Sequence, residues 1–153
     1  MWKEKLLISS CLIGENVKYD GLNNCLDENI LDKLKEKYHL INFCPEVEGG
    51  LPTPRIPCEI ISLKPLKIIN KIDEDKTINF INGANKTLQL CKKENIKIAL
   101  LKANSPSCSN KFIYNGKFNS TKVNGFGVTA KLLIENNIKV IDENEIEKLL
   151  YIS

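Results

Sequence analysis

Short runs of apolar residues alternate along the chain with longer segments whose apolar positions follow a helical period. The short runs are typical of β-strands, and the periodic segments are typical of amphipathic helices. Strands that alternate with helices predict a mainly parallel sheet with helices on both faces. We therefore expect an α/β fold, a single-domain three-layer αβα arrangement over residues 1–153 with a small β-hairpin. The expected strands are residues 5–10, 39–43, 96–101 and 138–141, and the expected helices are 28–38, 75–95, 128–136 and a short one from about residue 144.

Two of the expected helices have recognisable starts and inward faces. Asp27 is a favourable N-cap residue for the first helix, and Asp75 or Thr77 can cap the second. The apolar positions of each helix fall on one side, which should face the sheet. These positions are Leu26, Ile30, Leu31, Leu34 and Tyr38 in the first helix, and Ile78, Ile81, Leu88 and Cys91 in the second.

Three other segments have no helical period. Residues 45–57 hold four prolines and two glycines, so we expect neither helix nor central strand there. Long connections of this kind are usually functional in compact domains. Residues 60–70 should be irregular or extended. Residues 111–118 predict a β-hairpin, because Asn115-Gly116 supplies the positive φ angles of a tight turn.

Composition and charge exclude several classes of function. The hydrophobic fraction of 42% and the charged fraction of 27% are ordinary for a globular protein. The apolar runs are too short to span a bilayer, and the N-terminal segment lacks the features of a signal peptide, so we expect a cytoplasmic protein. The net charge is only +3 and lysines are interspersed with acidic residues, which does not indicate nucleic acid binding. A small-molecule partner is expected, and the oligomeric state is left open.

Three cysteines lie where predicted strands end. Cys11 and Cys44 directly follow the first two strands, and Cys108 follows the third after a short loop. Ligands of an open parallel sheet bind at the carboxyl ends of its strands, so these three thiols should meet at one edge. Three thiolates form an incomplete metal shell, and the open position permits chemistry. Spacing alone leaves two possibilities, a shared metal site or three separate core thiols.

The other three cysteines carry a weaker signal. Cys91 lies on the apolar face of a helix and is expected in the core, and packing is also the better interpretation for Cys25 and Cys58. No Cys-x-x-Cys pair occurs, which argues against zinc ribbons and thioredoxin-like sites. Without a secretory signal, metal binding or redox work is more plausible for these cysteines than structural disulfides.

The segment after Cys44 supplies charged candidates for chemistry. Glu46 follows the rigid Pro45 and can exchange protons with a bound water or substrate, whereas Glu48 reads as a surface carboxylate. Arg55 is the single arginine among 22 basic residues, and the neighbouring prolines should hold it in place. Its planar fork can pair with Glu46 or grip an anionic or carbonyl group.

The loop before Cys108 supplies hydroxyl groups. Ser105 and Ser107 flank Pro106, and their hydroxyls can bind a developing anion or cap their own backbone. His39 is the only histidine and begins a strand, which argues against a histidine-dependent triad. No glycine-rich nucleotide-binding motif is present.

Taken together, these segments resemble the thiouracil desulfidase family, which was long catalogued as a domain of unknown function. The resemblance covers nearly the whole chain, and its second block is long and unusual in composition. It implies a [4Fe-4S] cluster held by Cys11, Cys44 and Cys108, with one iron left open. The matching blocks are residues 8–21, 44–55, 105–108, 114–118 and 125–130.

The resemblance also implies residue roles and a reaction. Glu46 would be the acid/base group and Ser105 an assisting residue, with Arg55, Ser107 and Lys18 at the substrate. Lys18 stands where the family commonly has arginine, and Ser109 where glycine is usual. The implied reaction is non-redox desulfuration of a thiolated pyrimidine, with C=S replaced by C=O and hydrosulfide released. A non-catalytic iron–sulfur redox or sensor protein and a three-cysteine zinc hydrolase are the alternatives.

Overall fold

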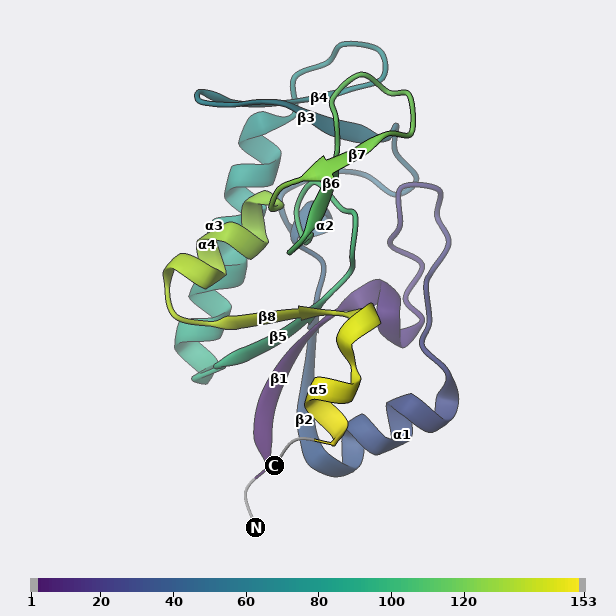
Figure 1. Ribbon diagram of the computed structural model, residues 1–153, viewed down its shortest axis with the longest axis vertical. Helices are drawn as coiled ribbons and strands as arrows, with labels where there is room; N and C mark the ends of the chain where they lie inside the picture. The colour runs from purple at the N-terminus through teal and green to yellow at the C-terminus, as the bar shows by residue number, and fades with distance from the viewer. Residues whose placement is uncertain (1–2, 152–153) are drawn as a thin grey trace.

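A four-stranded parallel sheet forms the centre of the computed structural model, which describes residues 3–151 (Figure 1). The strand order is β2-β1-β5-β8, and all three neighbouring pairs run parallel. This arrangement confirms the expected α/β fold with a mainly parallel sheet. The strands are β1 (Glu4–Ser9), β2 (Tyr38–Phe43), β5 (Ile98–Leu101) and β8 (Lys139–Asp142).

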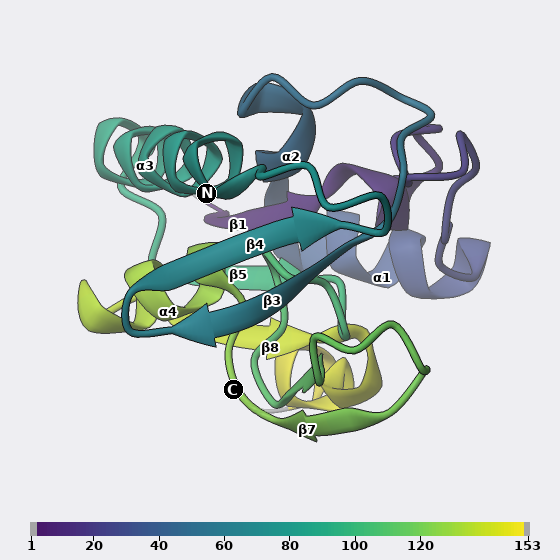
Figure 2. The ribbon, with the colours of Figure 1, turned by 90° about the horizontal axis from the view of Figure 1, so that it is seen from above.

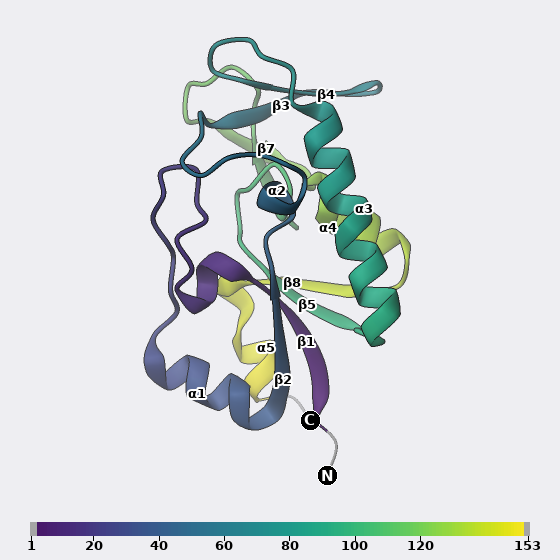
Figure 3. The ribbon, with the colours of Figure 1, turned by 180° about the vertical axis from the view of Figure 1, so that it is seen from behind.

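Different helices cover the two faces of the sheet (Figures 1 and 3). Successive side chains of a strand point to opposite faces. Accordingly, Leu6 and Ile8 of β1 join one buried cluster, and Leu7 joins the other. The first cluster packs against α1 (Glu28–Lys37) and α5 (Glu147–Leu150), and the second packs against α3 (Thr77–Glu94) and α4 (Val128–Glu135). Among the described residues, no helix is long and apolar enough to cross a membrane.

The cap of α1 follows the sequence, but the N-cap residue of α3 is Lys76 and not Asp75 or Thr77, and one inward position of α3 is also wrong. Asp27 accepts the N–H of Asn29, as expected of an N-cap, although α1 ends at Lys37 and Tyr38 already belongs to β2. Ile78 is 67% exposed, so its expected inward position is wrong. The buried side of α3 is formed instead by Phe80, Gly83, Ala84, Thr87 and Cys91.

Two connections contain more regular structure than expected. Residues 45–57 begin with a short helix, α2 (Pro45–Glu48), where we expected none. Proline is favoured at the first helical position because its missing N–H has no intrahelical partner there, so Pro45 starts this helix. Residues 60–70 are extended, which was one of the two expected alternatives. They belong to an antiparallel hairpin of β3 (Cys58–Leu63) and β4 (Leu66–Asn70), which lies across the carboxyl edge of the parallel sheet (Figure 2).

The second hairpin is wider than its sequence suggests. Its strands are β6 (Phe112–Tyr114) and β7 (Lys122–Asn124), and residues 115–121 form the loop between them. The expected tight turn at Asn115-Gly116 is wrong, because only Gly116 of the pair has a positive φ, at 85°. The hairpin itself is confirmed, and the remaining regular elements are η1 (Ser10–Ile13) and η2 (Glu143–Glu145).

Glycine permits α2 to lie directly on α3. A Cβ atom added at Gly83 of α3 would lie 2.0 Å from the carbonyl oxygen of Pro45, and one at Gly49 would lie 2.1 Å from that of Asn79. Both obstacles are backbone atoms, which cannot rotate away. The position of α2, and of the residues beside it, therefore depends on the absence of two side chains.

We expect Gly83→Ala to lower the stability of the protein. In an open helix this change stabilises by roughly 0.5–1 kcal/mol, but here the new methyl group overpacks against Pro45, which costs roughly 1–3 kcal/mol. Thermal and urea unfolding measure the difference. Gln89→Ala, at an exposed position of the same helix, is the matched control and should leave the midpoint nearly unchanged. A stabilised Gly83→Ala protein would contradict the contact.

Candidate functional site

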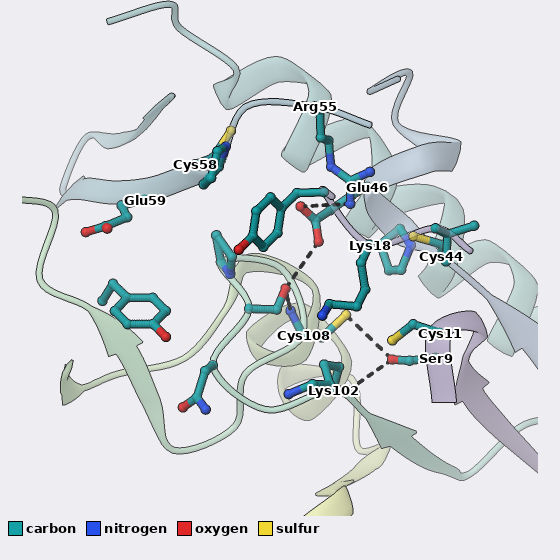
Figure 4. A pocket seen from close by; sticks show the side chains of 18 of the residues that line it. Ser9, Cys11, Lys18, Cys44, Glu46, Arg55, Cys58, Glu59, Lys102 and Cys108 are labelled. Carbon is teal, nitrogen blue, oxygen red and sulfur yellow. Dashed lines mark hydrogen bonds and ion pairs between the residues drawn. The ribbon is translucent and has the colours of Figure 1, made fainter. Parts of the chain in front are cut away.

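A cavity of about 480 Å³ lies at the carboxyl edge of the parallel sheet (Figure 4). Its floor comes from the segments that follow β1, β2 and β5, and the two hairpins contribute its other walls. This is the position at which open parallel sheets bind ligands. Cys11, Cys44 and Cys108 all line the cavity, so the structure brings together the three thiols that were predicted to meet.

Each of these cysteines is placed by a different element. Cys11 lies in η1 after β1, Cys44 is the N-cap residue of α2, and Cys108 lies in the loop after β5. All three are free thiols, and Cys11 and Cys108 are only 8% and 4% exposed. The alternative of three separate core thiols is therefore wrong, because all three cysteines line one cavity.

The loop that carries Cys108 is seated on α4 by another glycine. A Cβ atom at Gly127 would lie 2.4 Å from both the carbonyl carbon and the carbonyl oxygen of Ser107. The backbone N–H groups of Thr129 and Ala130 donate to the same oxygen at 2.8 and 3.1 Å. Gly127 thus permits the close approach that holds the Cys108 loop against the start of a helix.

Burial keeps the three thiols protonated in the protein alone. It raises the pKa of Cys11 to about 11 and also raises the pKa of Cys44 and of Cys108. Neighbouring negative charge adds to the shift at Cys108, first from Glu46 and then from the other two cysteines. Metal binding requires thiolates, so loading this site would release protons.

Hydrogen-bond donors surround the sulfur atoms and could stabilise them as thiolates. The side chain of Asn24 bonds to Cys11, and backbone N–H groups at the start of α2 bond to Cys44. The hydroxyl of Ser9 lies 3.9 Å from the sulfur of Cys108 and accepts the N–H of Lys102 at 3.0 Å (Figure 4). Because Ser9 accepts from Lys102, its own proton is available to Cys108.

The donor set fits a cluster better than a single ion. In the described part of the chain, no three Cys, His, Asp or Glu side chains are placed to hold one metal ion. A mononuclear zinc site would need every sulfur at about 2.3 Å from one centre. Each thiolate of a [4Fe-4S] cluster binds a different iron, so its ligands are spread more widely. Three free thiols that line one cavity supply the type of ligand that such a cluster binds.

A carboxylate and a guanidinium group pair beside the thiols. Glu46 in α2 lies 3.5 Å from Arg55, measured between Oε1 and Nη2, and the Arg55 side chain is only 6% exposed. Arg55 is fixed further by bonds from Nη1 to the Pro52 carbonyl and the Thr53 hydroxyl. Burial raises the pKa of Glu46, and the charge of Arg55 and a hydrogen bond from Ser105 oppose the shift. Pairing with Glu46 was one of the two roles expected for Arg55.

Ser105 joins Glu46 to the Cys108 loop, whereas Ser107 lies behind the cavity wall. The Ser105 hydroxyl donates to Glu46 at 3.4 Å and accepts the N–H groups of Ser107 and Cys108 at 3.0 and 3.1 Å. Ser107 is 1% exposed and does not line the cavity, which was its expected place as a substrate residue. Its hydroxyl lies 2.6 Å from that of Thr129, and its side chain also bonds to Cys108. Lys18 lines the cavity, with its Nζ 3.7 Å from Asp20.

The hairpins add residues to which the sequence assigned no role in the site. Glu59 in β3 lines the cavity, as do Tyr114 and Phe118 from the second hairpin. Cys58 at the start of β3 also lines it, although packing was the expected role of this cysteine. Burial raises the pKa of Cys58 to about 11, so this thiol is also protonated. Tyr114 and Phe118 lie in one of the blocks that carry the family resemblance, which was the only available signal for them.

Comparison with known proteins decides the family. A model of the family described as 2-thiouracil desulfurase matches residues 6–145. The chain belongs to this family. Its relatives include the uncharacterized protein YbbK of Bacillus subtilis (strain 168), 40% identical over 152 residues, which are 95% of this chain and 99% of YbbK. The solved structure of the [4Fe-4S]-dependent thiouracil desulfidase TudS is 41% identical and has a TM-score of 0.90, with 96% of this chain and 95% of that chain covered.

Membership of the 2-thiouracil desulfurase family confirms the resemblance found in the sequence. The likeness to TudS extends over nearly all of both chains.

We expect Ser105→Ala to destabilise this 2-thiouracil desulfurase family member by about 1–2 kcal/mol, because two backbone N–H groups lose their acceptor. Ser105→Thr keeps the hydroxyl oxygen and should restore most of the loss. Denaturant unfolding of the protein without added metal measures both variants. Equal stability of the alanine variant and the parent would contradict the capping role of Ser105.

Proposed function

We propose that the protein is a [4Fe-4S]-dependent thiouracil desulfidase, which replaces the thiocarbonyl of a thiolated pyrimidine by a carbonyl and releases hydrosulfide. One observation carries the proposal: three free thiols that follow three strands, two of them buried and one partly buried, line the same cavity as the paired Glu46. The 41% identity to a protein named for this cofactor and substrate supports it.

Cys11, Cys44 and Cys108 would hold the cluster. Three protein ligands for four irons leave one iron without a cysteine. When bound, the cluster would supply a Lewis acid at that iron, which polarises the carbon–sulfur bond of the substrate. The hydrogen bonds that reach the three sulfurs from Asn24, the start of α2 and Ser9 would then serve thiolates instead of thiols.

Glu46 would move the protons of the reaction. Its carboxylate accepts a proton from a water whose oxygen bonds to the thiocarbonyl carbon. As the carbon–sulfur bond breaks, Glu46 returns this proton to the sulfur, which leaves with the electron pair as hydrosulfide. The proton of the remaining hydroxyl group passes to Glu46, so the carbon is left as a carbonyl. Water and thiocarbonyl thereby give carbonyl and hydrosulfide without an oxidant or a reductant. Arg55 holds Glu46 in place by the 3.5 Å ion pair.

Ser105 and Lys18 would act on the substrate. The Ser105 hydroxyl, fixed by two backbone N–H groups and directed to Glu46, can orient the attacking water. Lys18 brings a cation to the cavity wall, where it can bind a carbonyl or anionic part of the substrate. We propose a small thiolated pyrimidine as the substrate, because the weak net charge of +3 does not favour a folded RNA.

We expect each of Cys11→Ser, Cys44→Ser and Cys108→Ser to abolish cluster retention, because each variant removes one of three thiolate ligands. Iron and sulfide analysis after anaerobic reconstitution, with absorbance near roughly 400 nm as the optical signature of the cluster, is the measurement. Cys91→Ser is the matched control, since this cysteine is a buried residue of α3 that does not line the cavity. A full cluster in any of the first three variants would overturn the ligand assignment.

We expect Glu46→Gln to keep the cluster and to lower kcat for 2-thiouracil by roughly 100-fold or more, the usual scale for loss of an acid/base group. Loss of the thiocarbonyl absorbance measures the rate, and hydrosulfide release checks the product. An unchanged rate would refute the acid/base role. A colourless zinc protein would favour the hydrolase alternative, and a cluster that cycles between redox states without desulfuration would favour the sensor.

A further inference from the structure

One loop contributes to the wall of the cavity on the side of the hairpins. Residues 115–121 connect β6 to β7, and Phe118 and Ser120 of this loop line the cavity next to Tyr114 at the end of β6. Phe118 and Ser120 have positive φ angles of 54° and 62°. Residues other than glycine keep such conformations only where surrounding contacts impose them. The loop must therefore be held by groups outside it.

Glu59 is one of those groups. It belongs to β3, is only 8% exposed, and its Oε1 accepts the backbone N–H of Gly116 at 2.9 Å and of Phe118 at 3.3 Å. In the part of the chain that the structure describes, no lysine or arginine forms an ion pair with Glu59. A buried carboxylate normally needs a cation or several hydrogen bonds. The loop amides supply those bonds, so Glu59 and the loop satisfy each other.

Gly116 brings the loop onto the backbone of β3. A Cβ atom at this position would lie 2.8 Å from the carbonyl oxygen of Ile60 and 3.0 Å from the Cα of Ile61. Its φ of 85° also favours glycine. The loop thus has two attachments to the same strand, the close contact at Gly116 and the bonds to Glu59. These contacts explain why Asn115-Gly116 does not form a simple two-residue turn.

We propose that Glu59 is a positioning residue for substrate binding, which holds the 115–121 loop as a fixed wall of the cavity. The inference rests on the proposed function, because it takes the cavity to be the site of the thiolated pyrimidine. Glu59 itself lines the cavity, but its Oε1 is bonded to two amides of the loop, so we assign its effect on substrate binding to the position of the loop. The three cysteines and Glu46 lie on other segments, η1, α2 and the loop after β5, and do not depend on this attachment.

Kinetics of the cluster-loaded protein with 2-thiouracil test the proposal. Glu59→Ala should raise KM at least about tenfold, with kcat within about threefold and iron content unchanged, because binding is impaired and chemistry is not. Glu59→Gln keeps an oxygen that can accept both N–H groups and should stay close to the parent. An unchanged KM in the alanine variant, or equal damage in the glutamine variant, would overturn the positioning role.

Limited trypsin digestion gives a readout that does not need activity. Lys117 is exposed inside the loop, so faster cleavage after it reports detachment of the loop from β3. Glu59→Ala should be cut there at least about fivefold faster than the parent, whereas Glu59→Gln and the control Lys67→Ala, an exposed position of the same hairpin, should not. Equal cleavage in all four proteins would overturn the attachment.

Two further results separate the possible failures. Gly116→Ala should detach the loop without altering Glu59, and it serves if Glu59→Ala does not fold. Parental cleavage and KM in Gly116→Ala would contradict the proposal. If the parent protein itself fails to act on thiolated pyrimidines, the proposed function is wrong, and digestion still decides whether Glu59 holds the loop.

Discussion

Close backbone contact at two glycines fixes the distance between the parallel sheet and the residues at its carboxyl edge. Gly83 lets α2 rest on α3, and Gly127 lets the Cys108 loop rest on α4. Both helices pack on the same face of the sheet, so one layer of helices positions two of the three cysteines at the sheet edge. The third, Cys11, follows β1 directly and takes its place from the strand.

The carboxyl edge of the sheet also holds charged groups that would be unfavourable in the interior without partners. Glu46 pairs with Arg55, whose side chain is almost fully covered, and the hydroxyl of Ser105 adds a neutral donor. Breaking such a pair leaves an uncompensated charge in a poorly solvated place. The prolines around Arg55 therefore help to keep this ion pair in place as well as to direct the path of the chain.

Much of this arrangement could be predicted from the sequence, because its signals are local. Three of the four strands of the parallel sheet are followed by a cysteine, and the rule for parallel sheets converts that pattern into a common edge. Glu46, Ser105 and Arg55 were found in the same way, from their neighbours in the chain. The cap at Asp27 and the alternation of strands and helices are equally local features.

The residues that were missed depend on contacts between distant segments. Glu59 has no signal of its own, since its partners are backbone amides more than fifty positions further on. Ser107 was misplaced because its sequence neighbours point to a ligand, while its hydroxyl bonds to Thr129 in the next helix. Ile78 was expected to face inward because the buried side of the helix was placed one position away from its true place. Tertiary packing decides which side of the helix is buried.

The order of the cysteines along the chain has a consequence for biosynthesis. Under the proposed function, the cluster needs Cys11 near the start, and it needs a Cys108 loop that is seated only once Gly127 and the helix behind it have formed. A ribosome must therefore have released most of the polypeptide before the metal can be inserted. The nascent chain would carry its first thiols unprotected until then, so cells that make this protein would benefit from delivering iron and sulfide only after translation is nearly complete.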